Sequence, residues 1–264
     1  MFLEPIDFAS MYREHKATTD FKGKTNTDWD EKSKDMAASV INSPYVNDFI
    51  SHMKLTGDEV VLDIGCGPGT LAVPLAKLVK EVIAIDFSAQ MLEELKAYAA
   101  REGVTNIKTY HIGWEDDWSH LPPIDIVVAS RSMEVSDIDA ALAKMSGHAS
   151  KACYLTYKVG GSFVDMNILD YIGKKVKTKP DYWYIPILLY SKGYLPRVDY
   201  IETGRGSVRA GNEEEFVESL IWSVHELNDE QKVKAREYYR DVIVGQNHPP
   251  RAVNWAFISW ECAQ

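Results

Sequence analysis

Residues 60–70 read Val60-Val-Leu-Asp-Ile-Gly-Cys-Gly-Pro-Gly-Thr70. Four apolar residues interrupted by one acid are typical of a buried strand, and the glycines after them predict a tight turn that leads into a helix. In a β-α-β unit, this turn is where the main chain comes closest to a ligand. Glycine suits it because glycine accepts positive φ and has no Cβ to hold a nucleoside away. The sequence therefore predicts an α/β fold with a ligand site at this turn.

An acid after the second apolar run supports the same interpretation. Asp86 ends Val82-Ile-Ala-Ile-Asp86 and follows the glycines at the distance, about twenty residues, that is usual for a ribose-binding acid. A carboxylate at the end of this strand can accept hydrogen bonds from both ribose hydroxyls. We therefore expect the ligand to contain a nucleoside.

The spacing of the glycines distinguishes between nucleotide ligands. A nicotinamide dinucleotide fingerprint has the spacing G-x-G-x-x-G and places a pyrophosphate at the helix N-terminus. This chain instead has Gly65-x-Gly67-x-Gly69, with Asp63 two residues before the first glycine. An acid at that position would repel a pyrophosphate and suits a cationic group. An NAD-dependent oxidoreductase is therefore the less favoured alternative.

The pattern D-x-G-x-G-x-G resembles the first motif of class I S-adenosylmethionine (SAM)-dependent methyltransferases. The resemblance is specific at residues 60–70 and 81–91, weaker but consistent across 106–160, and generic elsewhere. It implies SAM as the cofactor and S-adenosylhomocysteine as the product, with the turn facing the methionine moiety and Asp86 holding the ribose. It also implies an α/β fold with a doubly wound, mostly parallel seven-stranded sheet, helices on both faces and an antiparallel last strand.

The resemblance also predicts which residues surround the cofactor. Phe87 and Met91 follow Asp86 and would form apolar walls for the adenine, although both also suit ordinary helix packing. The expected cofactor-binding residues are Asp63, Gly65, Cys66, Gly67, Gly69, Asp86, Phe87, Met91, Gly113, Trp114, Glu115 and Ser130.

One turn departs from the family pattern. After the third strand the family often reads Gly-Asp-Ala-Glu, and the acid accepts a hydrogen bond from the adenine amino group. The place of that acid falls on Gly113 here, followed by Trp114, Glu115 and Asp116. The adenine contact is then open between the Trp114 backbone and the carboxylates of Glu115 and Asp116, either of which also suits a solvated loop. The Trp114 ring is a further candidate, for stacking on adenine.

The methyl acceptor is expected at the carboxyl end of the fourth strand, where Ser130-Arg131-Ser132-Met133-Glu134 follows residues 124–129. Three motifs of related enzymes are absent there: the Pro-Pro-aromatic motif of amino-nucleobase enzymes, the Pro-Cys of cytosine C5 enzymes and the acid of magnesium-dependent catechol enzymes. No catalytic residue is assigned, and Arg131 and Glu134 are the candidates. Arg131 suits either an anionic substrate or a surface ion pair.

Aromatic residues supply the other substrate candidates. Trp29, or Tyr12, would belong to a lid over the cofactor, unless the N-terminal helices simply pack on the sheet. Tyr182 and Trp183 lie in the aromatic run 181–190 and would line a pocket over the carboxyl edge of the sheet, unless they pack a core.

Composition limits the partners. The chain has 264 residues, 45% of them hydrophobic, with 29 basic and 39 acidic residues and a net charge of −10. This charge disfavours a long phosphate backbone, so the expected partner is a small-molecule acceptor and no nucleic acid. We expect neither a signal peptide nor a membrane span, because the first residues lack a basic start and no segment has about twenty apolar residues. Three widely spaced cysteines indicate a reducing cytoplasm, scattered histidines indicate no metal, and the oligomeric state stays open.

The alternation of elements predicts one methyltransferase domain. Its parts are an N-terminal helical lid (1–57), a SAM-binding core (58–160), a helical cap insertion (161–193) and C-terminal strands and helices (194–264). Strands are expected at 60–64, 81–86, 106–111, 124–129, 150–158, 194–203 and 251–261, and helices at 70–79, 88–101, 135–146, 213–226 and 229–240. Ser88 and Ser136 are the expected helix caps, and Pro74 requires the first of these helices to begin late.

Two functions from different classes follow. The first is methyl transfer to a small molecule by in-line displacement at the sulfonium methyl, in which positioning supplies most of the rate. The second is a non-catalytic SAM-binding or sensing protein, which the departure at Gly113 leaves open.

Overall fold

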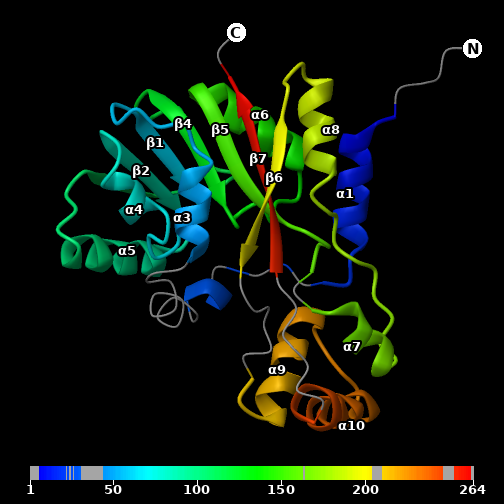
Figure 1. The fold of residues 1–264 in the computed structure, drawn as a ribbon. Helices are drawn as coiled ribbons and strands as arrows, with labels where there is room; N and C mark the ends of the chain where they lie inside the picture. Colours follow the sequence, from blue (N-terminus) through cyan, green and yellow to red (C-terminus); the bar gives the residue numbers. More distant parts are fainter. Residues whose placement is uncertain are drawn as a thin grey trace, which may run out of the picture.

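The computed structural model describes residues 6–21, 23, 25, 27–30, 44–162, 164–203, 210–245 and 253–262. Within them the chain forms a seven-stranded sheet of order β3-β2-β1-β4-β5-β7-β6 (Figure 1). The strands are β1 (Val60–Ile64), β2 (Glu81–Asp86), β3 (Ile107–His111), β4 (Ile124–Ser130), β5 (Ala149–Lys158), β6 (Arg197–Thr203) and β7 (Val253–Glu261). Strands β1 to β5 pair in parallel, whereas β7 is antiparallel to both β5 and β6. The predicted fold is confirmed.

Helices cover both faces of this sheet. They are α1 (Phe8–Thr18), α3 (Pro44–Ser51), α4 (Ala72–Ala76), α5 (Ala89–Arg101), α6 (Ile138–His148), α7 (Met166–Tyr171), α8 (Tyr184–Ser191), α9 (Glu213–Val224) and α10 (Asp229–Tyr238), which continues as the π-helical turn η1 (Tyr239–Val244). Alternate residues of β1 divide between two cores, because side chains of a strand point to opposite faces. Leu62 and Ile64 pack with α1, α6 and α8, and Val61 packs with α3, α4 and α5. None of the described helices is long and apolar enough to cross a bilayer.

Capping residues explain where the helices beside the site begin. Ser88 caps α5 as expected, because its Oγ accepts a hydrogen bond from the Met91 N–H at 3.1 Å. Helix α4 begins only at Ala72, so Pro74 lies in its first turn, where a missing N–H costs nothing. Helix α6 begins at Ile138, later than expected, and its cap is Asp137 rather than Ser136.

A third core holds a separate helical cluster, which we call the cap. It consists of α7, α9, α10 and η1, and Phe21 packs into it. In Figure 1 the cap lies at the lower end of the molecule, below the sheet. Its helices α9 and α10 are inserted between β6 and β7, which pair with each other as far as Thr203 and Val253.

The expected cap segment 161–193 is therefore divided. Only α7 joins the cap, whereas α8 packs with α1 and α6 against the sheet. The physical reason is composition: α8 reads Tyr-Ile-Pro-Ile-Leu-Leu-Tyr-Ser, and Ile185, Leu188 and Leu189 are all buried. A helix with so many apolar side chains is buried in the larger core beside the sheet. The helices inserted between β6 and β7, together with α7, form the cap.

Candidate functional site

The glycine turn after β1 contains three glycines with positive φ, and their surroundings are of two kinds. A Cβ on Gly65 would lie 2.5 Å from Ser132 Cβ, and one on Gly69 would lie 2.9 Å from Leu95 Cγ. Both glycines therefore let neighbouring elements approach. A Cβ on Gly67 would have no neighbour within 4 Å among the described residues. The space above Gly67 can thus receive a ligand.

Asp63, on β1, has a buried carboxyl group that is only partly hydrogen-bonded within the described residues. Its side chain is 1% exposed, and Oδ2 has no hydrogen-bond partner among the described residues. Burial, together with the nearby charge of Asp86, raises the pKa of this carboxyl to about 7. A buried polar atom without a partner is costly, so it marks a place where a donor from outside the chain fits.

Asp86 ends β2 and holds the glycine turn in place. Its Oδ2 accepts a hydrogen bond from the Gly67 N–H at 2.8 Å, and its Oδ1 accepts one from the Ser88 N–H at 2.9 Å. Burial raises the pKa of the Asp86 carboxyl, and these two hydrogen bonds oppose that effect. Each carboxylate oxygen has a second lone pair, so both can still accept from ribose hydroxyls.

The loop after β3 lies beside the residues that follow Asp86. A Cβ on Gly113 would come within 3.2 Å of Phe87 Cβ, and the Phe87 side chain is 40% exposed. The Gly113 N–H donates to Asp116 Oδ2 at 2.7 Å, and its carbonyl accepts from Trp118 Nε1 at 2.9 Å. Since Asp116 uses its carboxylate within the loop, Glu115, which is exposed, has the freer carboxylate of the two.

Trp114 connects this loop to the end of β4. Its Nε1–H donates to the Ser132 carbonyl at 3.0 Å, and its ring lies 5.6 Å from the ring of Trp118. Its backbone carbonyl accepts from Lys144 Nζ at 2.7 Å. Hydrogen bonds therefore hold Trp114 at both its ring and its backbone. Through its ring, Trp114 connects the loop after β3 to the turn after β4.

The carboxyl end of β4 carries a chain of hydroxyl groups. The Tyr45 hydroxyl, from α3, lies 2.7 Å from Ser130 Oγ and 2.7 Å from Thr156 Oγ1. Burial raises the pKa of the Tyr45 phenol. Arg131 follows with φ 59°, its N–H donating to Thr156 Oγ1 and its Cζ 4.5 Å from the centre of the Tyr45 ring. The expected surface ion pair of Arg131 is not found among the described residues.

Glu134, after the end of β4, forms ion pairs with helix α1 and with the segment before α8. Its carboxylate accepts from Lys16 Nζ at 3.1 Å and from Lys179 Nζ at 2.6 Å. Burial opposes ionisation, but the two lysines outweigh it and lower the pKa of Glu134. Both carboxylate oxygens are thus already engaged in ion pairs.

The N-terminal segment reaches the cofactor side through Asp30. Asp30 Oδ1 accepts a hydrogen bond from Ser88 Oγ, two residues from Asp86. Trp29, the expected lid residue, precedes it and is half-buried, whereas residues 31–43 of the expected lid lie outside the described ranges. Tyr12 does not belong to a lid: it is fully buried, and its hydroxyl donates to the Val135 carbonyl at 3.0 Å.

The aromatic residues before α8 are partly exposed. Trp183 is 40% exposed and stacks on Tyr184, with ring centres 3.9 Å apart. Tyr182 forms a hydroxyl contact of 2.5 Å with Tyr200 on β6. Tyr184 is buried against Tyr12, so only its two predecessors remain candidates for a substrate.

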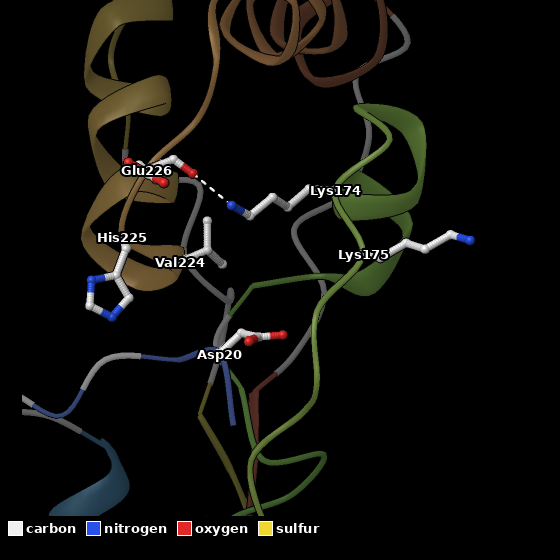
Figure 2. Close-up of a pocket in the computed structure, with 6 residues that line it drawn as sticks. All are labelled: Asp20, Lys174, Lys175, Val224, His225 and Glu226. Carbon is white, nitrogen blue, oxygen red and sulfur yellow. Dashed lines mark hydrogen bonds between the residues drawn. The ribbon is translucent and has the colours of Figure 1, made fainter. Parts of the chain in front are cut away.

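A wide hollow of about 600 Å³ lies at the base of the cap, away from these residues. Figure 2 shows Lys174 reaching across it to the Glu226 carbonyl, at 2.9 Å. Its lining consists of Asp20, Lys174, Lys175, Val224, His225 and Glu226. None of the expected cofactor residues lines it, so we do not assign the cofactor there.

Four residues of the site were not predicted: Asp30, Tyr45, Ser132 and Thr156. Ser132 Oγ donates to the Ile64 carbonyl at 2.6 Å, directly before the glycine turn. Only Ser132 and Thr156 had a signal in the sequence, because each follows or ends a predicted strand at the carboxyl edge. Tyr45 and Asp30 come from N-terminal segments that carry no motif.

Comparisons with known proteins agree with this geometry. A family model described as a methyltransferase domain matches residues 61–151. An uncharacterized protein of Haemophilus influenzae is 33% identical over 264 residues, and the match covers 98% of both chains. The 23S rRNA (uracil(1939)-C(5))-methyltransferase RlmD of Aliivibrio salmonicida is 32% identical over 108 residues, which are 40% of this chain and 23% of RlmD.

Solved structures share the fold. The YcgJ protein of Bacillus subtilis superposes with a TM-score of 0.58 at 16% identity, covering 83% of this chain and 98% of YcgJ. Geranyl diphosphate C-methyltransferase of Streptomyces coelicolor A3(2), solved with S-adenosyl-L-homocysteine, superposes with a TM-score of 0.51 at 13% identity, covering 83% and 78%. The methyltransferase domain, the sheet order and the glycine turn lead to one conclusion. This chain belongs to the class I SAM-dependent methyltransferases.

Proposed function

We propose that this enzyme transfers a methyl group from SAM to a small-molecule acceptor, with the cofactor bound between the glycine turn and Asp86. One observation carries the placement: within the described part of the chain, the buried Oδ2 of Asp63 has no hydrogen-bond partner, and it lies beside a turn that is open above Gly67. The amino group of the methionine moiety is the cationic donor that this oxygen lacks. Asp86 would hold the ribose hydroxyls.

The remaining cofactor contacts follow from the positions of the turns. Phe87 and Met91 would flank the adenine, with Gly113, Trp114 and Glu115 at its edge. Ser130, and the residues Gly65, Cys66 and Gly69 of the turn, would line the methionine side. Bound SAM supplies an activated sulfonium methyl. The chain itself must bind the acceptor in line with that methyl and exclude water.

A proton acceptor is required only if the acceptor loses a proton during transfer. Glu134 is poorly suited, since both its oxygens are paired with lysines. The hydroxyls of Ser130, Tyr45 and Thr156 form a connected path at the end of β4, which can relay a proton away from the acceptor. Trp29, Tyr182 and Trp183 are proposed as contacts of the acceptor.

A nucleic-acid acceptor is the second candidate, favoured by the partial match to RlmD. The net charge of −10 opposes it, because binding to a phosphate backbone relies on clustered lysine and arginine. The turn after β4, residues 130–134, contains no cysteine, so it lacks the thiol nucleophile of cytosine C5 enzymes. We therefore favour a small acceptor.

The proposal extends to organisation and location. We describe the chain as one methyltransferase domain, with the cap and the aromatic residues before α8 serving acceptor binding. We place the protein in the cytoplasm, which its three cysteines, widely spaced along the sequence, support.

Calorimetry with four ligands tests the proposal: SAM, S-adenosylhomocysteine, NAD and NADP. We expect the first two to bind and the other two not to bind. A metabolite screen scored by formation of S-adenosylhomocysteine then identifies the acceptor. Binding of NAD without SAM would contradict the placement of the cofactor, and tight SAM binding without any turnover would favour a sensing protein.

A further inference from the structure

Arg131 occupies an unusual backbone conformation at the end of β4. Its φ is 59°, in the left-handed region that non-glycine residues seldom adopt. Three hydrogen bonds hold the turn: the Arg131 N–H to Thr156 Oγ1 at 3.1 Å, Ser130 to Tyr45 at 2.7 Å and Ser132 to Ile64 at 2.6 Å. Strain of this kind persists where the surroundings enforce it, and it is common at ligand sites.

The guanidinium of Arg131 rests on aromatic rings instead of an acid. Its Cζ lies 4.5 Å from the centre of the Tyr45 ring and 6.0 Å from that of Trp255 on β7. Among the described residues, none accepts a hydrogen bond from this guanidinium and none forms an ion pair with it. Stacking fixes the plane of the group and leaves its N–H donors at the edge available.

The neighbouring acid does not serve as a partner. Glu134 is three residues further along the chain, but its carboxylate is engaged by Lys16 and Lys179. Elsewhere in the described chain, Arg13, Arg236 and Arg240 pair with acids, whereas Arg101 and Arg197, like Arg131, have no acid within 4 Å. Arg131 is exposed at the end of β4, so its guanidinium is available to an anionic ligand there.

Arg131 directly follows β4, at the end of the strand where the methyl acceptor is expected to bind. It stands between Ser130 and Ser132, and Ser132 contacts both the Ile64 carbonyl and the place of a Cβ on Gly65. The Arg131 backbone is thus next to a residue that contacts the glycine turn, and its guanidinium lies over the Tyr45 ring, whose hydroxyl contacts Ser130. Resting on the proposed methyl transfer, we propose that the acceptor is a small anion, with a carboxylate or phosphate group bound by the edge of the Arg131 guanidinium.

Paired acceptors test this proposal in the full-length protein. Carboxylates and phosphate monoesters are compared with uncharged counterparts, for example benzoate with benzamide and phenyl phosphate with phenol. Two readouts are used: formation of S-adenosylhomocysteine from SAM, and the melting temperature of the S-adenosylhomocysteine complex. The carboxylate and phosphate arms show which anion is bound. Variants are Arg131→Asn, which accepts positive φ without charge, and Arg131→Lys, which keeps the charge but not the planar fork.

The control is Arg101→Gln. Arg101 also stacks on an aromatic ring, that of Tyr98 at 4.9 Å, but it ends α5 away from the glycine turn. We expect anions alone to be methylated or to raise the melting temperature. Arg131→Asn should weaken this response about tenfold to a hundredfold through KM, with Arg131→Lys intermediate and Arg101→Gln unchanged. Affinity for S-adenosylhomocysteine should stay constant in all three.

The outcomes separate the two proposals. Equal use of charged and uncharged acceptors, an anion response that survives in Arg131→Asn, or no response to any anion would overturn the role of Arg131 while the cofactor still binds. Failure of the wild-type protein to bind S-adenosylhomocysteine would instead overturn the proposed function itself.

Discussion

Asp63 makes the stability of the ligand-free protein depend on pH in an unusual direction. Its pKa is raised from the ordinary 3.8 to about 7 by burial and by Asp86. The folded state therefore holds a proton that the unfolded state has released, so stability falls as pH rises through this window. The full difference corresponds to about 4 kcal/mol, of which about 2–3 kcal/mol is lost between pH 5 and pH 8.

The Asp63→Asn variant isolates this contribution, because an amide has a similar shape and no charge. We expect urea unfolding to show a variant that is more stable than wild type by about 1–2 kcal/mol near pH 5 and by about 4 kcal/mol near pH 8, so that the gap widens by about 2–3 kcal/mol. Glu59 does not contribute to the change in stability between pH 5 and pH 8. Its hydrogen bonds from Thr56 and Gly57 outweigh its burial and lower its pKa to about 2. The contribution of Glu59 is lost only in more acidic solution.

Ligand and control measurements sharpen the test. Saturating S-adenosylhomocysteine should remove the pH dependence of the wild type, since its amino group compensates the ionised carboxylate. Asp117→Asn is the control, because Asp117 is exposed and its hydrogen bonds from Ser119 lower its pKa, away from this window. Parallel curves of stability against pH for wild type and Asp63→Asn would refute the reasoning.

Three further substitutions follow from the site. Gly67→Val should abolish SAM binding in a folded protein, at a strain of about 1–3 kcal/mol, and unchanged calorimetric affinity would show that this turn does not hold the cofactor. Asp86→Ala should weaken SAM about tenfold or more, whereas Asp117→Ala should not; the reverse order would mean that the ribose site is elsewhere. Trp183→Ala should raise the KM for the acceptor at constant SAM affinity, and a kinetic profile identical to wild type would remove Trp183 from the site.

The parts of the fold that were predicted have strong local signals. Strands β1 and β2 begin and end where the apolar runs at 60–64 and 81–86 predicted, because buried parallel strands read as nearly continuous apolar sequence. The turn between β1 and α4 was also predicted from a local signal, since its three glycines have the positive φ that other residues seldom adopt. The cofactor motif is thus local in sequence.

The parts that were not predicted depend on distant contacts. Tyr45 meets Ser130 across 85 positions and Thr156 across 111, and no local pattern announces such a pairing. The destination of α8 was likewise undetermined, because its apolar residues fit a cap as well as a sheet. In the structure α8 packs into the core beside the sheet and not into the core of the cap. This choice depends on tertiary contacts, which the local sequence does not reveal.

The pairing of Thr203 with Val253 has a consequence for how this enzyme could change its substrate. Facing residues of an antiparallel ladder have Cα atoms about 4.5–5.5 Å apart, and the Thr203 hydroxyl also donates to the Val253 carbonyl at 2.9 Å. Residues 204–252 therefore depart from and rejoin the sheet at a hairpin position, where a two-residue turn would suffice. Exchange of this insertion leaves the strand register and the cofactor motif untouched. If the cap serves acceptor binding as proposed, acceptor choice can evolve by replacement of the insertion between the last two strands, provided that the new segment also covers the apolar face of α7.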